Sequence, residues 1–262
     1  LAAACSPAVP AGPTAEDIAT ESKKLTDYLN AEFEEELAMN PMMLTQMGRK
    51  ELYDQLGDFS EADVSKQLEW RRESVAGMRA ASDPAKLNDD AKTSWAIWES
   101  ELDRSELRAA WQRHSYVYAY GGPHTDLPNF LITYHKVEAP SDIDAYISRI
   151  ALLGPAIDQF TERAKLAVAD GIRTPKFGYE RTATEAKNVI TGAPFGPGPA
   201  SPLWEDINTK IGFLLASDRA NDGQAAAWKA AAEAALKNKV KPAYERLIAW
   251  LNADMANAPS GK

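Results

Sequence analysis

Apolar residues recur at helical spacing along most of the chain, and no stretch alternates between apolar and polar as a strand pair would. The first such stripe consists of Leu25, Tyr28, Leu29, Phe33 and Leu37. Side chains three or four residues apart lie on one face of a helix. Thr14 followed by Asp17 resembles the reciprocal cap that opens many helices. The sequence therefore predicts a first helix from about residue 14 to residue 38.

The same pattern predicts further helices along the chain, each opened by a polar cap residue or a proline. They cover residues 41–48, 60–81, 89–111, 141–171, 175–192 and 224–253. Cap signals at Ser141 with Asp144 place the start of the long central helix. Inside it, Gly154-Pro155 predicts a kink or a split, and Pro242 predicts a bend in the last helix. The expected fold class is all-α, a bundle of long, partly kinked helices.

Residues 192–202, with the sequence GAPFGPGPASP, form the clearest loop in the chain. Glycine and proline at this density interrupt regular structure. We interpret the segment as a structured excursion within one helical domain, residues 14–262, because the helical pieces on either side are short. The alternative is that it separates two subdomains.

Composition narrows the possible partners. The chain has 262 residues, of which 45% are hydrophobic, and carries a formal charge of −9. An acidic protein repels phosphate backbones, so we expect no nucleic-acid partner. No run of 18 apolar residues is present, so the sequence predicts no membrane-spanning helix.

The only cysteine, Cys5, follows Leu-Ala-Ala-Ala at the start of the chain. Small residues directly before a cysteine are typical of the end of a lipoprotein signal peptide. In this interpretation residues 1–13 comprise a signal remnant, the lipidation site Cys5 and a proline-rich tether, and the protein is lipid-anchored in the bacterial cell envelope. The alternative is a chance cysteine in a disordered tail.

No complete catalytic motif is visible in the sequence. The three histidines, His114, His124 and His135, are ten and eleven residues apart. A zinc-protease helix needs two histidines four residues apart with a glutamate between them. No G-x-S-x-G elbow or phosphate loop is present either. We therefore assign no catalytic and no metal-binding residue. We expect the methionines of residues 39–47 and the tryptophans at 95, 98 and 111 to pack in the core. The alternatives are copper(I) binding by the methionines and a carbohydrate or peptide platform formed by the tryptophans.

The stretch GGPHTDLPNFL, residues 121–131, combines glycines, prolines and polar side chains between helical segments. Two hypotheses account for it. In the structural one, the glycines make a turn, Thr125 caps a helix that begins near Leu127, and a proline occupies the first turn. In the functional one, His124, Asp126 and Asn129 line a ligand cleft.

Five motifs, in this order, resemble the bacterial family named domain of unknown function 885. They are FEEELAMNPMMLTQMG (33–48), GGPHTDLPNFL (121–131), GIRTPKFGYERT (171–182), SPLWEDI (201–207) and KPAYERLIAWL (241–251). The resemblance covers roughly residues 16–252. It implies a longer protein similar to helical zinc peptidases of the gluzincin type, with an H-E-x-x-P-G-H motif in a C-terminal half.

None of those zinc-binding residues is present in this sequence. The resemblance thus implies zinc only for a C-terminal half, with no cofactor in this chain. It favours the N-terminal wall of a cleft for a peptide-like substrate. The competing hypothesis is a non-enzymatic helical lipoprotein that binds a peptide or a protein partner.

Overall fold

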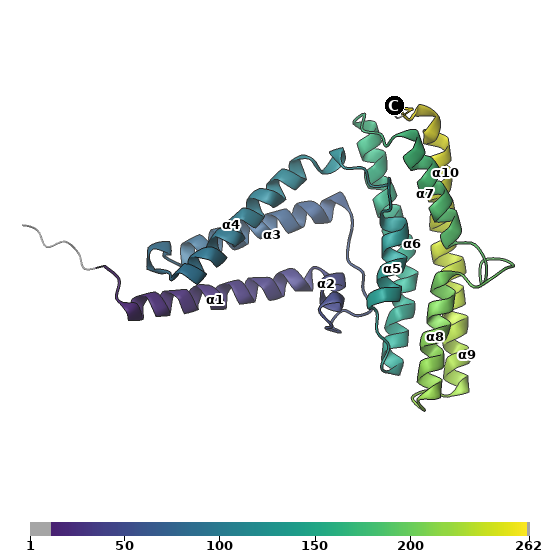
Figure 1. The fold of residues 1–262 in the computed structure, drawn as a ribbon, viewed down its shortest axis with the longest axis horizontal. Coiled ribbons are helices and arrows are strands. Elements are labelled where there is room, and N and C mark those ends of the chain that lie inside the picture. The colour runs from purple at the N-terminus through teal and green to yellow at the C-terminus, as the bar shows by residue number, and fades with distance from the viewer. Residues whose placement is uncertain (1–11, 261–262) are drawn as a thin grey trace, which may run out of the picture. The chain divides into compact units, whose positions relative to one another are not determined.

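The structure is a computed structural model that describes residues 12–260, and every regular element in that range is a helix (Figure 1). The all-α prediction is confirmed. Cys5 lies outside the described residues. The helices are α1 (Ala15–Ala38), α2 (Pro41–Gln46), α3 (Glu61–Ala81), α4 (Asp89–Ala110), α5 (Pro123–Tyr134), α6 (Pro140–Ala169), α7 (Lys176–Val189), α8 (Pro202–Ala216), α9 (Asp222–Ala235) and α10 (Lys241–Asp254).

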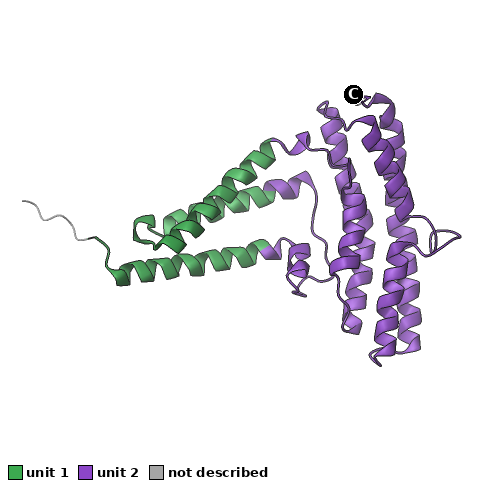
Figure 2. Ribbon diagram, viewed as in Figure 1, with its two compact units in different colours: residues 1–36, 66–110 green, residues 37–65, 111–262 purple. Residues whose placement is uncertain are grey.

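The chain divides into two compact units, each described here by itself (Figure 2). Unit 1 contains residues 1–36 and 66–110, and therefore most of α1, α3 and α4. Unit 2 contains residues 37–65 and 111–262, and it holds α2 and α5–α10. Both flanks of the 192–202 loop belong to unit 2. Two backbone hydrogen bonds close that loop, from Ala193 N to Pro199 O and from Ser201 N to Ala193 O.

Unit 1 is a three-helix arrangement with a small core of its own. Leu25, Val75 and Met78 are fully buried at its centre. Arg71 is also buried, and its guanidinium lies between the rings of Trp70 and Trp98 and pairs with Glu36. The reciprocal cap at Thr14 and Asp17 forms as predicted, with each side chain accepting the backbone N–H of the other residue.

Unit 2 contains the main core, in which α6 packs against α9 and α10 while α7 packs against α5 and α10. The predicted stripe of the last helical segment is entirely buried: Leu236, Val240, Tyr244, Leu247 and Leu251. This agreement follows from spacing alone, since residues three or four apart along one face meet the same neighbour.

The two internal prolines are accommodated differently. The long helix α6 continues through Pro155, so the predicted split does not occur. Before Pro242, the chain forms a π-helical segment at residues 236–240, in which Lys241 N donates to Leu236 O. A proline ring clashes with the carbonyl four residues earlier, and a wider π turn relieves that clash. A Cβ on Gly154 would approach Lys239 O to 2.4 Å, so the π segment fits against the glycine of α6.

The start of α6 differs by one residue from the prediction. The helix begins at Pro140, and the side chain of Asp142, not Asp144, accepts the N–H groups of Glu138 and Ala139. Proline is favoured at the first helical position because its missing N–H has no partner there in any case. Asp144 instead accepts a hydrogen bond from the indole of Trp228 at 2.8 Å.

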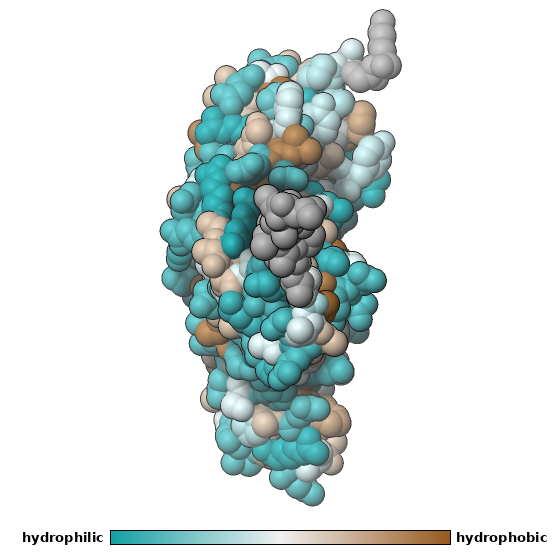
Figure 3. Space-filling view, turned by 90° about the vertical axis from the view of Figure 1, so that its left-hand side faces the viewer, coloured by the Kyte–Doolittle hydropathy of each residue, from teal (hydrophilic) through white to brown (hydrophobic). Residues whose placement is uncertain are grey.

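Several apolar side chains expected in the core are exposed. Trp111 and Met47 are more than half exposed, and Met43 is also exposed. The prediction of core packing is therefore wrong for these three residues, whereas Met42 does pack against the core. Helical spacing identifies a face but not whether a neighbour covers it. The face drawn in Figure 3 is mostly hydrophilic, with hydrophobic residues scattered over it.

A buried cation connects residues 41–56 to α6. Arg149 is fully buried, and its guanidinium donates to Gln55 O at 2.8 Å and to Thr45 Oγ1 at 2.7 Å. It also lies 3.2 Å from His135 Nδ1. Burial lowers the pKa of Arg149 to about 10. The charge is held by neutral acceptors and by the ring of Tyr53, 4.9 Å away.

His135 belongs to the same cluster and is neutral. Its Nε2 lies 2.8 Å from Asp142 O, and its ring stacks on Tyr53 at 4.0 Å. Because Nδ1 faces a guanidinium donor, the proton of the imidazole resides on Nε2. Burial, and then the charge of Arg149, lower the pKa of His135 to about 3.

Candidate functional site

The segment GGPHTDLPNFL makes a turn and then enters α5. Gly121 and Gly122 both have positive φ, at 81° and 133°, which favours glycine. The helix begins at Pro123, four residues earlier than predicted, so Thr125 lies inside the first turn and donates to Gly122 O. The second proline of the segment, Pro128, therefore lies within the helix.

A hydrogen bond near Pro128 connects this segment to α10. A residue at position 128 would normally donate its N–H to the carbonyl of His124, but proline has no N–H. The hydroxyl of Tyr244 donates to His124 O instead, at 2.6 Å. Tyr244 is fully buried and comes from the proline-alanine-tyrosine motif of α10. Two sequence motifs separated by 120 residues thus complete one another's hydrogen bonds.

His124 faces the interior and is fully buried. Its Nε2 lies 3.0 Å from Glu185 Oε2 on α7, and Glu185 also accepts from Arg181 at 2.7 Å. Burial lowers the pKa of His124 and outweighs the opposing effect of Glu185. Nδ1 is buried without a hydrogen-bond partner. This histidine connects α5 to α7.

The other two predicted ligand residues lie elsewhere on α5. Asp126 and Asn129 are both exposed, whereas His124 is buried. The structure therefore does not bring the three side chains together on one surface. A ligand on the outer face of α5 can contact Asp126 and Asn129. The buried His124 cannot contact such a ligand and contributes only by fixing the position of α5.

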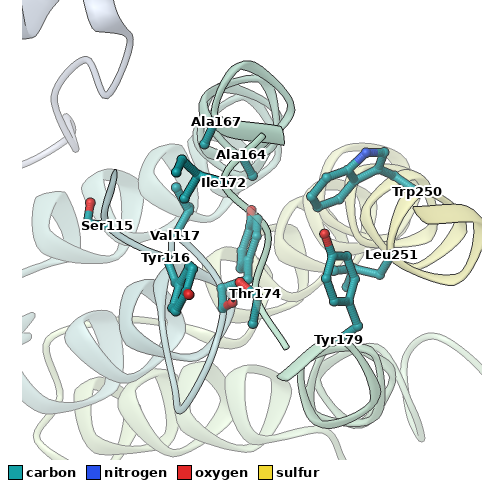
Figure 4. A pocket seen from close by; sticks show the side chains of 11 residues that line it. Ser115, Tyr116, Val117, Ala164, Ala167, Ile172, Thr174, Tyr179, Trp250 and Leu251 are labelled. Atoms are coloured by element: carbon teal, nitrogen blue, oxygen red, sulfur yellow. Dashed lines mark hydrogen bonds between the residues drawn. The ribbon is translucent and has the colours of Figure 1, made fainter. Parts of the chain in front are cut away.

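A small cleft lies within unit 2 (Figure 4). Part of its lining, residues 115–118, precedes the segment GGPHTDLPNFL in the sequence. The cleft is partly open to solvent, and its empty volume of about 300 Å³ includes part of that solvent. The lining comes from residues 115–118, α6, residues 172–174, α7 and α10. Figure 4 shows Trp250 reaching in from α10 and Tyr179 from α7, opposite Tyr116 and Val117. Most of the wall is apolar, so the cleft favours contact with an apolar group over a charged one.

Hydrogen bonds fix the walls of the cleft. Thr174 Oγ1 donates to Tyr118 O at 2.8 Å, and the Tyr179 hydroxyl donates to Asp254 Oδ2 at 2.6 Å. Arg173 also contacts Asp254, at 3.2 Å. Burial alone would raise the pKa of Asp254, but the hydrogen bonds from Tyr179 and Arg173 lower it on balance. Asp254 is therefore an ionised anchor for the α7 side of the cleft.

Exposed aromatic rings continue from the cleft onto the surface. Tyr116, Tyr120 and Phe177 are 52%, 72% and 42% exposed. We call these three residues the aromatic face. Tyr120 and Phe177 have ring centroids 5.3 Å apart, and the guanidinium of Arg181 lies 5.1 Å from the Tyr120 ring. The rings are thus held by neighbours and yet open to solvent.

The residues at this site do not fit a zinc centre. Within residues 12–260, no three side chains of histidine, cysteine, aspartate or glutamate gather as metal ligands. His124 and Glu185 form a pair in which Nε2 lies 3.0 Å from Oε2, but a zinc site needs at least three protein ligands. No catalytic step through a metal is therefore assigned to this chain.

The sequence does not predict the cleft, although two of the family motifs contain residues that line it. Tyr179 and Arg173 lie in the GIRTPKFGYERT motif, and Trp250 lies in KPAYERLIAWL. These motifs served to recognise a family, and nothing in either one alone shows that they meet.

Residues 41–262 match the sequence family described as "Bacterial protein of unknown function (DUF885)". The chain belongs to this family. The match includes four of the five motifs in full and the last part of the first, while residues 16–40 lie outside it. No curated protein matches the DUF885 chain. No described helix of it combines the length and apolarity that a bilayer crossing requires.

Among solved structures, the DUF885 chain is similar to one described as "the putative lipoprotein from Colwellia psychrerythraea". The TM-score is 0.67 and the sequence identity is 14%. The similarity covers 94% of this chain but 42% of the other. At this identity it shows a shared fold, and this chain spans less than half the length of the matched one.

Proposed function

We propose that this DUF885 chain is the N-terminal helical portion of a lipid-anchored, zinc-peptidase-like envelope protein, and that it forms one wall of a cleft for a peptide-like substrate. The observation that carries the proposal is the unequal coverage of the structural match, 94% of this chain against 42% of a longer one described as a lipoprotein. The five motifs resemble the DUF885 family, and the resemblance of its longer members to helical zinc peptidases of the gluzincin type supplies the reaction class. Zinc and the catalytic residues belong to the remaining part.

In this proposal the chain binds and orients substrate but does not transfer protons or hold metal. The apolar cleft between Val117 and Trp250 contacts an apolar part of the peptide. Asp126 and Asn129, exposed on α5, supply polar contacts to the peptide backbone. His124 fixes α5 against α7 through Glu185.

The test begins with the coding sequence beyond Lys262. An in-frame H-E-x-x-P-G-H motif, one bound zinc and peptide hydrolysis by the full-length protein are the expected results. A stop codon there, or a full-length protein without zinc, overturns the enzymatic part. Asn129→Ala in the full-length protein should lower kcat/KM at an unchanged Tm, whereas Asn30→Ala, at an exposed asparagine of α1, should change neither.

Lipid anchoring is tested separately. Cells fed a labelled fatty acid should incorporate the label into the wild-type protein and not into Cys5→Ser. Equal labelling of both proteins excludes Cys5 as the anchor.

A second candidate is a non-enzymatic lipoprotein that binds a peptide or a protein partner. The aromatic face beside the cleft favours it, since exposed rings bind polypeptides without metal chemistry. In that case the full-length protein binds peptides in calorimetry, and chelators do not alter its affinity.

A further inference from the structure

The aromatic face is an exposed, largely apolar surface of unit 2. Tyr120 and Phe177 are exposed side by side, and Tyr116, four residues before Tyr120 in the chain, is exposed at the apolar cleft. Exposed apolar surface of this kind is unfavourable in water and marks interfaces. Tyrosine in particular is enriched where binding energy concentrates. The face therefore calls for a covering partner.

The rings are also arranged for binding before a partner arrives. A Cβ on Gly178 would meet Thr174 Cγ2 at 2.2 Å, so the glycine leaves room for that side chain, and Ala119 Cα, in the loop that carries Tyr120, lies within ordinary contact of the same position at 3.6 Å. The guanidinium of Arg181 holds the Tyr120 ring from one side. Side chains fixed in this way lose little conformational entropy on association.

The charges beside the face are already paired within the chain. Arg181 binds Glu185 at 2.7 Å, and Arg173 binds Asp254. A phosphate or a nucleic acid would need free cations, which this surface does not offer among its described neighbours. An apolar stretch of polypeptide needs only the exposed rings, so the chemistry favours a protein segment.

The backbone after α10 leads to this place. A short helical turn, Met255–Asn257, follows α10, and Pro259 O then accepts the backbone N–H of Lys176 at 2.9 Å. Lys176 directly precedes Phe177. A polypeptide continuing from here starts at the edge of the aromatic face. Such a tether raises the effective concentration of the following segment at that surface.

We propose that the aromatic face of Tyr116, Tyr120 and Phe177 is the docking surface for the polypeptide that follows Lys262 in the longer protein. The inference rests on the proposed function, because it requires this chain to be the N-terminal portion. More than half of the matched solved chain has no counterpart here, which gives the occupant its length. The face then joins the two portions at the mouth of the cleft.

Hydroxyl-radical footprinting read by mass spectrometry tests the docking surface. The 262-residue chain and the full-length gene product are oxidised in parallel. We expect the oxidation rates of Tyr116, Tyr120 and Phe177 to fall severalfold in the full-length protein. Phe213 on α8 is the matched control: it is 51% exposed, an arginine lies near its ring as for Tyr120, and its rate should not change.

A variant identifies the contact. The double change Tyr120→Ser and Phe177→Ser should restore oxidation of Tyr116 in the full-length protein, whereas Phe213→Ser should leave Tyr116 protected. Equal oxidation of Tyr120 and Phe177 in the short and full-length proteins overturns the docking surface. The proposal is also overturned if the rings are protected in the 262-residue chain and this protection increases with protein concentration, because a second copy of the chain then covers them.

Peptidase activity separates this inference from the function on which it rests. Protected rings in a full-length protein that lacks zinc and hydrolysis support the docking surface and overturn the enzymatic function. Exposed rings in an active zinc peptidase do the reverse. A stop codon directly after Lys262 overturns both.

Discussion

The hydrogen bond between Tyr244 and His124 gives a quantitative test of how α5 and α10 depend on one another. Tyr244→Phe removes only the hydroxyl that donates to His124 O at 2.6 Å. Both residues are fully buried, and Pro128 cannot supply the missing donor. A buried carbonyl left without a partner costs about 1–3 kcal/mol. We therefore expect Tyr244→Phe to lower the free energy of unfolding by about 2 kcal/mol.

A double-mutant cycle that combines Tyr244→Phe with Pro128→Ala tests whether the tyrosine replaces the donor that proline lacks. In Pro128→Ala the new backbone N–H can donate to His124 O, as in an uninterrupted helix. Added to that background, Tyr244→Phe should cost about 1 kcal/mol less than in the wild type, which is the coupling energy of the double-mutant cycle.

Urea unfolding followed by circular dichroism measures all four proteins. The packing lost with the buried proline ring cancels in the cycle, so only the shared carbonyl contributes. A coupling energy indistinguishable from zero would refute the idea that the tyrosine replaces the donor that proline lacks.

Three further predictions concern the core of unit 2. The pKa of His135 is lowered to about 3 in the folded protein, so as the pH falls below about 6.5 the unfolded state takes up a proton first and the folded state loses stability. Between about pH 7.5 and about pH 5, the free energy of unfolding should therefore fall by about 2 kcal/mol more in the wild type than in His135→Gln. Equal losses for the two proteins in urea titrations would contradict this. Gly154→Ala should destabilise by about 1–3 kcal/mol because its Cβ meets Lys239 O, whereas Gly212→Ala, with no atom within 4 Å, should stabilise by about 0.5–1 kcal/mol; equal shifts in Tm would show that the contact has no effect. Arg149→Met leaves several buried acceptors without a donor and should cost roughly 3 kcal/mol or more in urea unfolding, a conclusion that a loss below about 1 kcal/mol would reject.

The helical elements were predictable because their signals are local. Spacing of apolar residues and caps such as Thr14 with Asp17 depend on neighbours within a few positions. The sequence patterns place the starts of α5 and α6 too late, because they take Thr125 and Ser141 as the capping residues. In the structure these helices begin at Pro123 and Pro140. In both cases the proline determines the start.

The candidate site was predictable only in part, since it depends on contacts between distant segments. Asp126 and Asn129 are exposed, but periodicity could not show that His124 would face Glu185 in the interior. The cleft joins residues 115–118 to Trp250, more than 130 positions later. No local pattern encodes such a pairing.

The close approach between Gly154 and the π segment has a consequence for how sequences of this family vary. A side chain at position 154 is incompatible with Lys239 O, and that carbonyl lies where it does because residues 236–240 form a wider turn. Neither feature can be lost alone without a clash or a gap. Glycine at position 154 and the extra residue of the π turn should therefore be inherited together, so that a relative with a regular α turn before its proline tolerates alanine in the long helix.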